Sequence, residues 1–155
     1  MRAVPLAARR GYALVEVLVA ATVLAIGLLG GVALLLDGVR AAREARHATA
    51  AAGLLSDLGE RIRANPPAGD AYALAADRSP EPPADRCESP CDAASIAAFD
   101  LAEWRQHAEA ALPGARTAVA VTAPDGGPAR RYRITVEWTV AGRDQPARLD
   151  AVVVP

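Results

Sequence analysis

A single carboxylate stands inside a long apolar run near the N-terminus of this 155-residue chain. Arg9, Arg10 and Gly11 precede the run, and Glu16 is the only charged residue within residues 12–36. A lone acid at the start of an apolar helix is costly in lipid, so it is a functional-site candidate by default. The alternative is a helix-end carboxylate that lies at the level of the lipid headgroups.

Cleavage of the peptide bond after Gly11 would give Tyr12 a free α-amine four residues from Glu16. An unpaired buried carboxylate is strongly unfavourable, whereas a carboxylate paired with an ammonium group in low dielectric is firmly held. Such a pair, within one chain or between neighbours, would fix the register at which an incoming subunit docks. Glu16 is therefore a candidate assembly residue, beside Gly11 and Tyr12 as candidate processing residues.

The apolar run is long enough to cross a bilayer, since about 25 residues give roughly 37 Å of helix at 1.5 Å per residue. The run is too long for a cleaved secretory signal, and no Ala-x-Ala site follows it. Arginines without acids precede it, which places the N-terminus in the cytoplasm and the rest outside, although arginines also follow it. The arginines before the run are Arg2, Arg9 and Arg10, and those after it are Arg40, Arg43 and Arg46.

The remaining polar residues offer little chemistry. A net charge of −1 gives no global case for binding nucleic acid. His47 and His107 stand alone, without a G-x-S-x-G or similar signature, so surface positions are expected for both. Cys87 and Cys91 fall on the side assigned to the periplasm, where an oxidising environment favours a disulfide. A metal pair lacks further ligands, and free thiols remain open.

One long helix is expected from Tyr12 to Asn65, because no proline interrupts it before Pro66. Beyond Asp37 its pattern becomes amphipathic, with an apolar stripe and with Arg61 and Arg63 pointing elsewhere. The stripe consists of Leu54, Leu55, Leu58 and Ile62. Residues 66–90 are rich in proline and small polar residues, which predicts a loop.

A second helix is expected at residues 93–112, capped by Asp92 and stopped by Pro113. Its expected apolar side is Ile96, Phe99, Leu101, Trp104, Ala108 and Leu112. Alternating patterns then predict three antiparallel strands, at residues 117–122, 132–140 and 148–154, in a meander with one face on the long helix. Trp104 and Trp138 are expected in the core, which must be small because aromatic residues are few. The fold class is α+β.

The segment from Gly11 to Ala20 resembles the class III signal of type IV pilins and pseudopilins, usually Gly followed by Phe-Thr-Leu-Ile-Glu. The resemblance implies cleavage after Gly11 by prepilin peptidase, N-methylation of Tyr12, and Glu16 at the position that governs assembly into a filament. Two departures occur, Tyr12 for the usual Phe and Ala13 for the usual hydroxyl residue, and both are conservative for the peptidase.

Further segments are similar to the PilV family of minor type IV pilins. They are residues 23–30, the run Glu60-Arg61-Ile62-Arg63-Ala64-Asn65-Pro66, the Cys87-x-x-x-Cys91 spacing, residues 99–104, and Leu112-Pro113-Gly114. The resemblance implies a type IV pilin-like fold with a leader at 1–11, a transmembrane helix at 12–36, a periplasmic continuation at 37–65, and a globular head at 66–155.

It also implies a non-enzymatic subunit that helps to prime or assemble the pilus fibre. Its expected partners are other minor pilins and the major pilin, prepilin peptidase, the inner-membrane pilus assembly machinery and membrane lipid. No cofactor and no direct nucleic-acid partner are expected. The subunit would first cross the bacterial inner membrane once, with its head in the periplasm, and then join the fibre.

Two alternatives remain open, a minor pseudopilin with the same fold and a binding module of a different functional class. A minor pseudopilin of a type II secretion system shares the leader, although the Arg-Ile-Arg-Ala-Asn run and the two cysteines point away from it. An adhesin displayed at a fibre tip would need its binding surface in the loop at residues 68–85 or in the strand turns. An uncleaved single-pass enzyme is a remote third possibility.

Overall fold

The computed structural model describes residues 9–77, 91–123 and 130–155, with side chains from Leu14 onward. Its elements are α1 (Arg9–Ala64), the 3₁₀ helix η2 (Pro66–Tyr72), α2 (Ala93–Ala111), β1 (Arg116–Thr122), β2 (Arg131–Trp138) and β3 (Ala147–Val153). The chain forms two compact units, residues 1–43 and 44–155, which are described separately.

The first unit contains the N-terminal part of α1. Between Leu14 and Val39 the large apolar side chains are all at least 44% exposed. The helix is long and apolar enough to cross a membrane by length and composition, with a mean hydropathy of 2.5 in its most apolar window. Its surface is therefore suited to lipid or to the apolar helices of other subunits.

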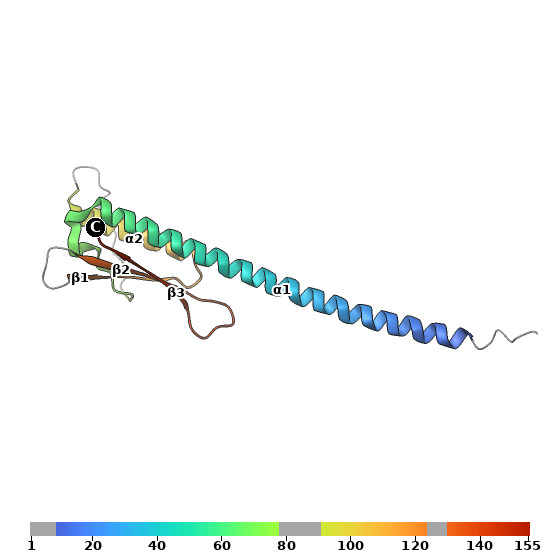
Figure 1. Cartoon of the computed structure of the whole chain (residues 1–155). Helices are drawn as coiled ribbons and strands as arrows, with labels where there is room; N and C mark the ends of the chain where they lie inside the picture. The colour runs from blue at the N-terminus through green and yellow to red at the C-terminus, as the bar shows by residue number, and fades with distance from the viewer. Residues whose placement is uncertain (1–8, 78–90, 124–129) are drawn as a thin grey trace, which may run out of the picture. The chain divides into compact units, whose positions relative to one another are not determined.

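The second unit is built around the C-terminal part of α1. The expected stripe is confirmed, because Leu54, Leu55, Leu58 and Ile62 are all buried. Figure 1 shows α2 running beside this part of α1, with the three strands on one side of the pair. The helix ends at Ala64 directly before Pro66, as the proline predicts.

The second helix is confirmed, with its N-cap at Asp92, whose Oδ1 accepts a hydrogen bond from the Ser95 backbone N–H at 2.7 Å. Four residues of its expected apolar side are confirmed as buried, namely Leu101, Trp104, Ala108 and Leu112, and two are not. Ile96 and Phe99 are 39% and 43% exposed. The buried side consists of Ala97, Leu101, Trp104 and Ala108. The small Ala97 and Ala108 allow α2 to approach its neighbours closely, and this places Trp104 rather than Phe99 in the core.

The expected loop after α1 is wrong over its first seven residues, which form η2. Tyr72 at its end is fully buried, and the ring packs edge-on against Tyr132 with centroids 6.4 Å apart. Leu74 then forms an antiparallel bridge with Val119 of β1. Two apolar side chains in a proline-rich stretch thus secure a segment whose composition alone indicates a loop.

The three strands form the expected antiparallel meander in the order β1-β2-β3. The register pairs Val119 with Ile134 and Ile134 with Ala151. Ile134, Val136 and Trp138 are buried, so the tryptophans pack in the core as expected. The fold is a long N-terminal helix with a small three-stranded antiparallel sheet, which confirms the α+β class.

Candidate functional site

The N-terminal candidate site lies in the first turns of α1. Gly11 and Tyr12 are both within the helix, and Glu16 follows one turn later with its side chain exposed. Leu14, Val15 and Val17 around it are 73%, 60% and 68% exposed. Within the described residues Glu16 makes no hydrogen bond or ion pair. A partner for this carboxylate would therefore come from outside the described side chains, and cleavage after Gly11 would supply one candidate, the α-amine of Tyr12.

The apolar surroundings determine what Glu16 can do. In a lipid or protein environment of low dielectric, a charged carboxylate among leucines and valines is stable only when it is paired. A positively charged group brought against it would therefore be held strongly and at a defined position. This arrangement offers recognition of a positive charge at a defined position along the helix.

The predicted disulfide is only partly within the structure. Cys91 lies next to Asp92, the N-cap of α2, whereas Cys87 lies outside the described residues. The Cys87–Cys91 pairing therefore stays a prediction. His107 is exposed on α2 and His47 is half-buried on α1. Among the described residues no three His, Cys, Asp or Glu side chains are grouped to hold a metal ion.

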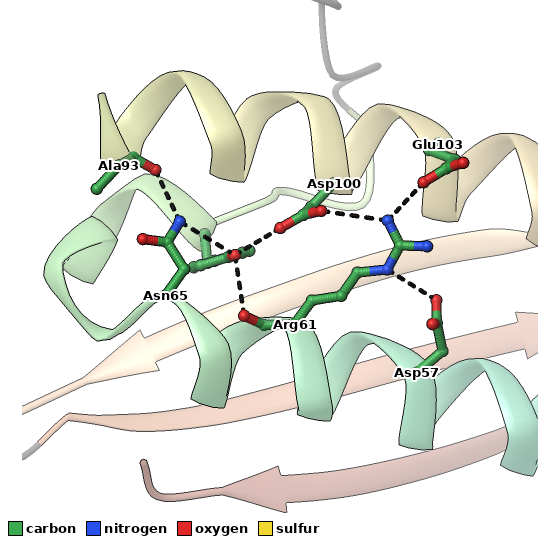
Figure 2. Close-up of polar contacts among 7 residues, drawn as sticks. Asp57, Arg61, Asn65, Ala93, Asp100 and Glu103 are labelled. Carbon is green, nitrogen blue, oxygen red and sulfur yellow. Dashed lines mark hydrogen bonds and ion pairs between the residues drawn. The ribbon is translucent and has the colours of Figure 1, made fainter. Parts of the chain in front are cut away.

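A second polar site, in the head, was not expected from the sequence. The guanidinium of Arg61, near the end of α1, binds three carboxylates (Figure 2). Its Nη1 lies 3.1 Å from Asp100 Oδ1 and 2.5 Å from Glu103 Oε2, both on α2. Its Nε lies 3.1 Å from Asp57 Oδ2, one turn earlier on α1. The Arg61 network therefore joins α1 to α2.

Asn65 and Tyr72 extend this network to the start of η2. The Tyr72 hydroxyl donates to Asp100 Oδ2 at 2.7 Å, and the buried Asn65 amide donates to the Ala93 carbonyl at 2.9 Å (Figure 2). Three elements thus meet at one point. α2 cannot slide along α1 without breaking several of these bonds. The network therefore fixes the register of the two helices.

The pKa values in the network follow from these contacts. Burial alone would lower the pKa of the Arg61 guanidinium, but hydrogen bonds to Glu103, Asp57 and Asp100 outweigh it and raise the pKa. The same contact lowers the pKa of Glu103 below its ordinary value. Burial, with the hydrogen bond to Asp100, raises the pKa of the Tyr72 phenol. All three groups therefore hold their usual charge state at neutral pH.

Alkaline pH should destabilise the head through Tyr72. Below about pH 10 the phenol keeps its proton in both the folded and the unfolded chain, and its contribution to stability is complete. Above that pH the unfolded chain loses the proton while the folded chain keeps it, so the free energy of unfolding falls, by up to about 1.4 kcal/mol per pH unit. Urea unfolding between pH 8 and 11.5, followed by near-ultraviolet circular dichroism, should show this decline.

Tyr72→Phe is the matched control, because it keeps the buried ring and removes the titrating group. It should be less stable at pH 8, through the lost bond to Asp100, and should show a shallower decline above pH 10. Tyr132, whose pKa burial also raises, supplies the remaining slope. An unchanged slope in Tyr72→Phe would contradict the assignment.

The fold and the N-terminal site together define a class, a protein with an exposed apolar helix and a small globular head. Two family models then match the chain. The prokaryotic N-terminal methylation motif matches residues 6–32, which include Gly11, Tyr12 and Glu16. The model described as Type IV pilin Tt1218 matches residues 33–102. No curated protein and no solved structure matches the chain significantly.

These two matches, which together cover residues 6–102, support a type IV pilin with an N-terminal methylation motif. A type IV pilin is a structural subunit and not an enzyme, as expected from the sequence. The motif implies processing by prepilin peptidase and contact with the pilus assembly machinery. Neither description names the PilV family or a minor position in the fibre, so both stay predictions.

Proposed function

We propose that this chain is a minor type IV pilin of the PilV kind, which helps to prime or assemble the pilus fibre. Prepilin peptidase would cleave it after Gly11 and methylate the amine of Tyr12. The observation that carries the proposal is Glu16, the only charge from residue 12 to residue 36 on an apolar helix that its own fold leaves exposed. An isolated charge in this setting is a recognition element for an opposite charge.

The proposed domain arrangement follows from the same helix. Residues 1–11 are the leader, 12–36 cross the inner membrane, 37–65 continue the helix in the periplasm, and 66–155 form the head. The N-terminus is cytoplasmic, in keeping with arginines before the span. The subunit leaves the membrane for the fibre when the apolar helix exchanges lipid for the helices of the major pilin and of other minor pilins.

The Arg61 network supports the PilV assignment. Two of the segments that resemble this family, residues 60–66 and 99–104, are more than 30 positions apart in the sequence. Arg61 and Asn65 come from the first, and Asp100 and Glu103 come from the second. If PilV proteins share this packing contact between α1 and α2, they must resemble the chain in both segments.

The loop surface that an adhesin could use for binding is smaller than the sequence indicates. Of its candidate loop at 68–85, the first part lies in η2, where Tyr72 is buried and Asp70 accepts a hydrogen bond from Arg130 at 2.9 Å. Deleting the whole loop would therefore disrupt the core. A binding test of this alternative should be confined to residues 78–85, which lie outside the described residues. The pseudopilin alternative is distinguished by neighbouring genes, which would encode pilus or secretion components.

N-terminal sequencing of the membrane-extracted protein tests the processing step. We expect the mature chain to begin with N-methyl-Tyr12 in cells that contain active prepilin peptidase. Gly11→Leu should retain the leader. Gly27→Ala is the matched control, because a Cβ at Gly27 would meet nothing within 4 Å, and it should be processed normally. A wild-type chain that still begins at Met1 or Arg2 would refute the proposal.

A further inference from the structure

Three arginines follow the exposed apolar part of α1 within two turns. Arg40, Arg43 and Arg46 are all exposed. At 100° per residue their three-residue spacing places them along one arc of about 120° on the helix surface. Glu44 is the only acid between Gly38 and Ser56, so this stretch carries more positive than negative charge.

The chain's own acids leave most of this charge unpaired. Glu44 Oε2 accepts a hydrogen bond from Arg143 Nη2 at 3.0 Å, so its carboxylate is already engaged by the turn between β2 and β3. Arg43 and Arg46 donate to no acceptor in the part of the chain that the structure describes. Two guanidinium groups on this arc are therefore available to an external anion.

Arg40 is engaged only weakly. Its Nη1 lies 3.3 Å from Asp37 Oδ1, and both side chains are 73% exposed. An ion pair with this exposure contributes little and exchanges readily with another partner. Arg40 is thus also able to bind an anion outside the chain, and the arc presents three guanidinium groups.

The position of the arc identifies the anion. Leu36 ends the apolar stretch, and at 1.5 Å per residue Arg40 lies about 6 Å and Arg46 about 15 Å further along the helix. The polar region of a bilayer extends roughly 5–8 Å beyond each side of its hydrocarbon core. Arginine side chains reach back to that level while their stems cover apolar surface. The guanidinium fork matches the oxygens of a phosphate group.

We propose that Arg40, Arg43 and Arg46 bind the phosphates of anionic phospholipids in the periplasmic leaflet. The proposal rests on the membrane-spanning role given to residues 12–36 under the proposed function. The contact sets the depth of the subunit in the membrane before assembly and opposes its movement along the membrane normal. It must break when the subunit enters the fibre, so it also adds to the work of extraction.

Native mass spectrometry of the full-length protein tests this proposal. The protein would be placed in nanodiscs of equimolar phosphatidylglycerol and phosphatidylcholine, and the lipids that stay bound after ejection would be counted. An arginine at an anionic surface favours an acidic lipid by about fivefold. We expect the wild-type protein to retain phosphatidylglycerol at least at that enrichment, and Arg40→Gln/Arg43→Gln/Arg46→Gln to retain the two lipids about equally.

The control variant also replaces three arginines, but on the exposed side of the sheet. Arg116→Gln/Arg131→Gln/Arg133→Gln should keep the wild-type enrichment. Equal enrichment in the wild type and in the helix triple variant would overturn the lipid proposal and leave the span intact. A wild-type protein that retains neither lipid would contradict the span, and with it both the proposed function and this inference.

Discussion

Trp104→Ala should lower the free energy of unfolding of the second unit by about 3–5 kcal/mol, the range for removing a large aromatic side chain from a core. Trp104 is the largest fully buried side chain and lies on the face of α2 turned toward α1. Its Nε1–H also donates to the Leu54 carbonyl at 2.8 Å. The substitution removes apolar burial and a hydrogen bond at one position.

The expected loss is a large part of the total stability, which for small domains is about 5–15 kcal/mol. With only six aromatic residues in the chain, no second ring is placed to fill the cavity. Tyr72 and Tyr132 pack against each other, and Trp138 lies at the end of β2. The surrounding leucines and alanines can collapse only partly, so the cavity term remains.

Urea unfolding of the full-length protein in detergent measures this effect through the near-ultraviolet circular dichroism of the remaining aromatic residues. Trp104→Phe should lose less, because a ring still fills most of the volume. Gln106→Ala, at an exposed position two residues further along α2, is the surface control and should change stability by less than about 0.5 kcal/mol. A Trp104→Ala midpoint close to that of Gln106→Ala would contradict this account of the core.

Much of the fold can be predicted because its signals are local. Pro66 ends α1, Asp92 caps α2, and the strict alternation around Ile134 marks β2, each within a few residues of the element that it defines. The meander follows because short turns join consecutive strands. The same locality accounts for the N-terminal candidate site, since Gly11, Tyr12 and Glu16 lie within six consecutive positions.

The Arg61 network could not be predicted, because its bonds join distant residues. Arg61 binds Asp100 and Glu103, which are 39 and 42 positions away. An arginine among acidic and apolar residues on a helix is indistinguishable from a solvated one until the facing helix is known. Arg61 lies in the segment, residues 60–66, that resembles PilV proteins. That resemblance did not say which residues Arg61 contacts.

Two differences from the sequence prediction have a common cause. They are the burial of η2 and the shift of the buried side of α2 away from Ile96 and Phe99. Both depend on which side chain fills the space beside α1, and this is a property of packing that local patterns do not contain. Tyr72 occupies part of that space from a proline-rich segment, and Trp104 occupies another part. Phe99, although more apolar than Ala97, is then left partly exposed. Periodicity gives a helix its apolar side only to within part of a turn.

Glu16→Gln should abolish incorporation of the subunit into fibres while leaving its cleavage after Gly11 intact. The proposed function gives Glu16 one partner, the methylated amine of a processed Tyr12, in an environment formed by apolar helices. Glutamine keeps the size and one acceptor oxygen, but it replaces the other oxygen with a donor NH2 group and removes the charge. The amine would then be buried without a counter-charge, at a cost of about 3–5 kcal/mol, which lowers occupancy about 100-fold or more.

The measurement compares the subunit in sheared fibres with the subunit in the membrane, by immunoblot, and sequences the N-terminus of the membrane fraction. Val17→Ala is the matched control, because it alters the next residue of the same exposed helix surface without a change of charge. It should enter fibres at near wild-type levels. Normal incorporation of Glu16→Gln would show that apolar packing alone sets the register, since no other charge on residues 12–36 could replace the carboxylate. Loss of incorporation together with loss of cleavage would instead assign Glu16 to recognition by the peptidase, and the register argument would then fail.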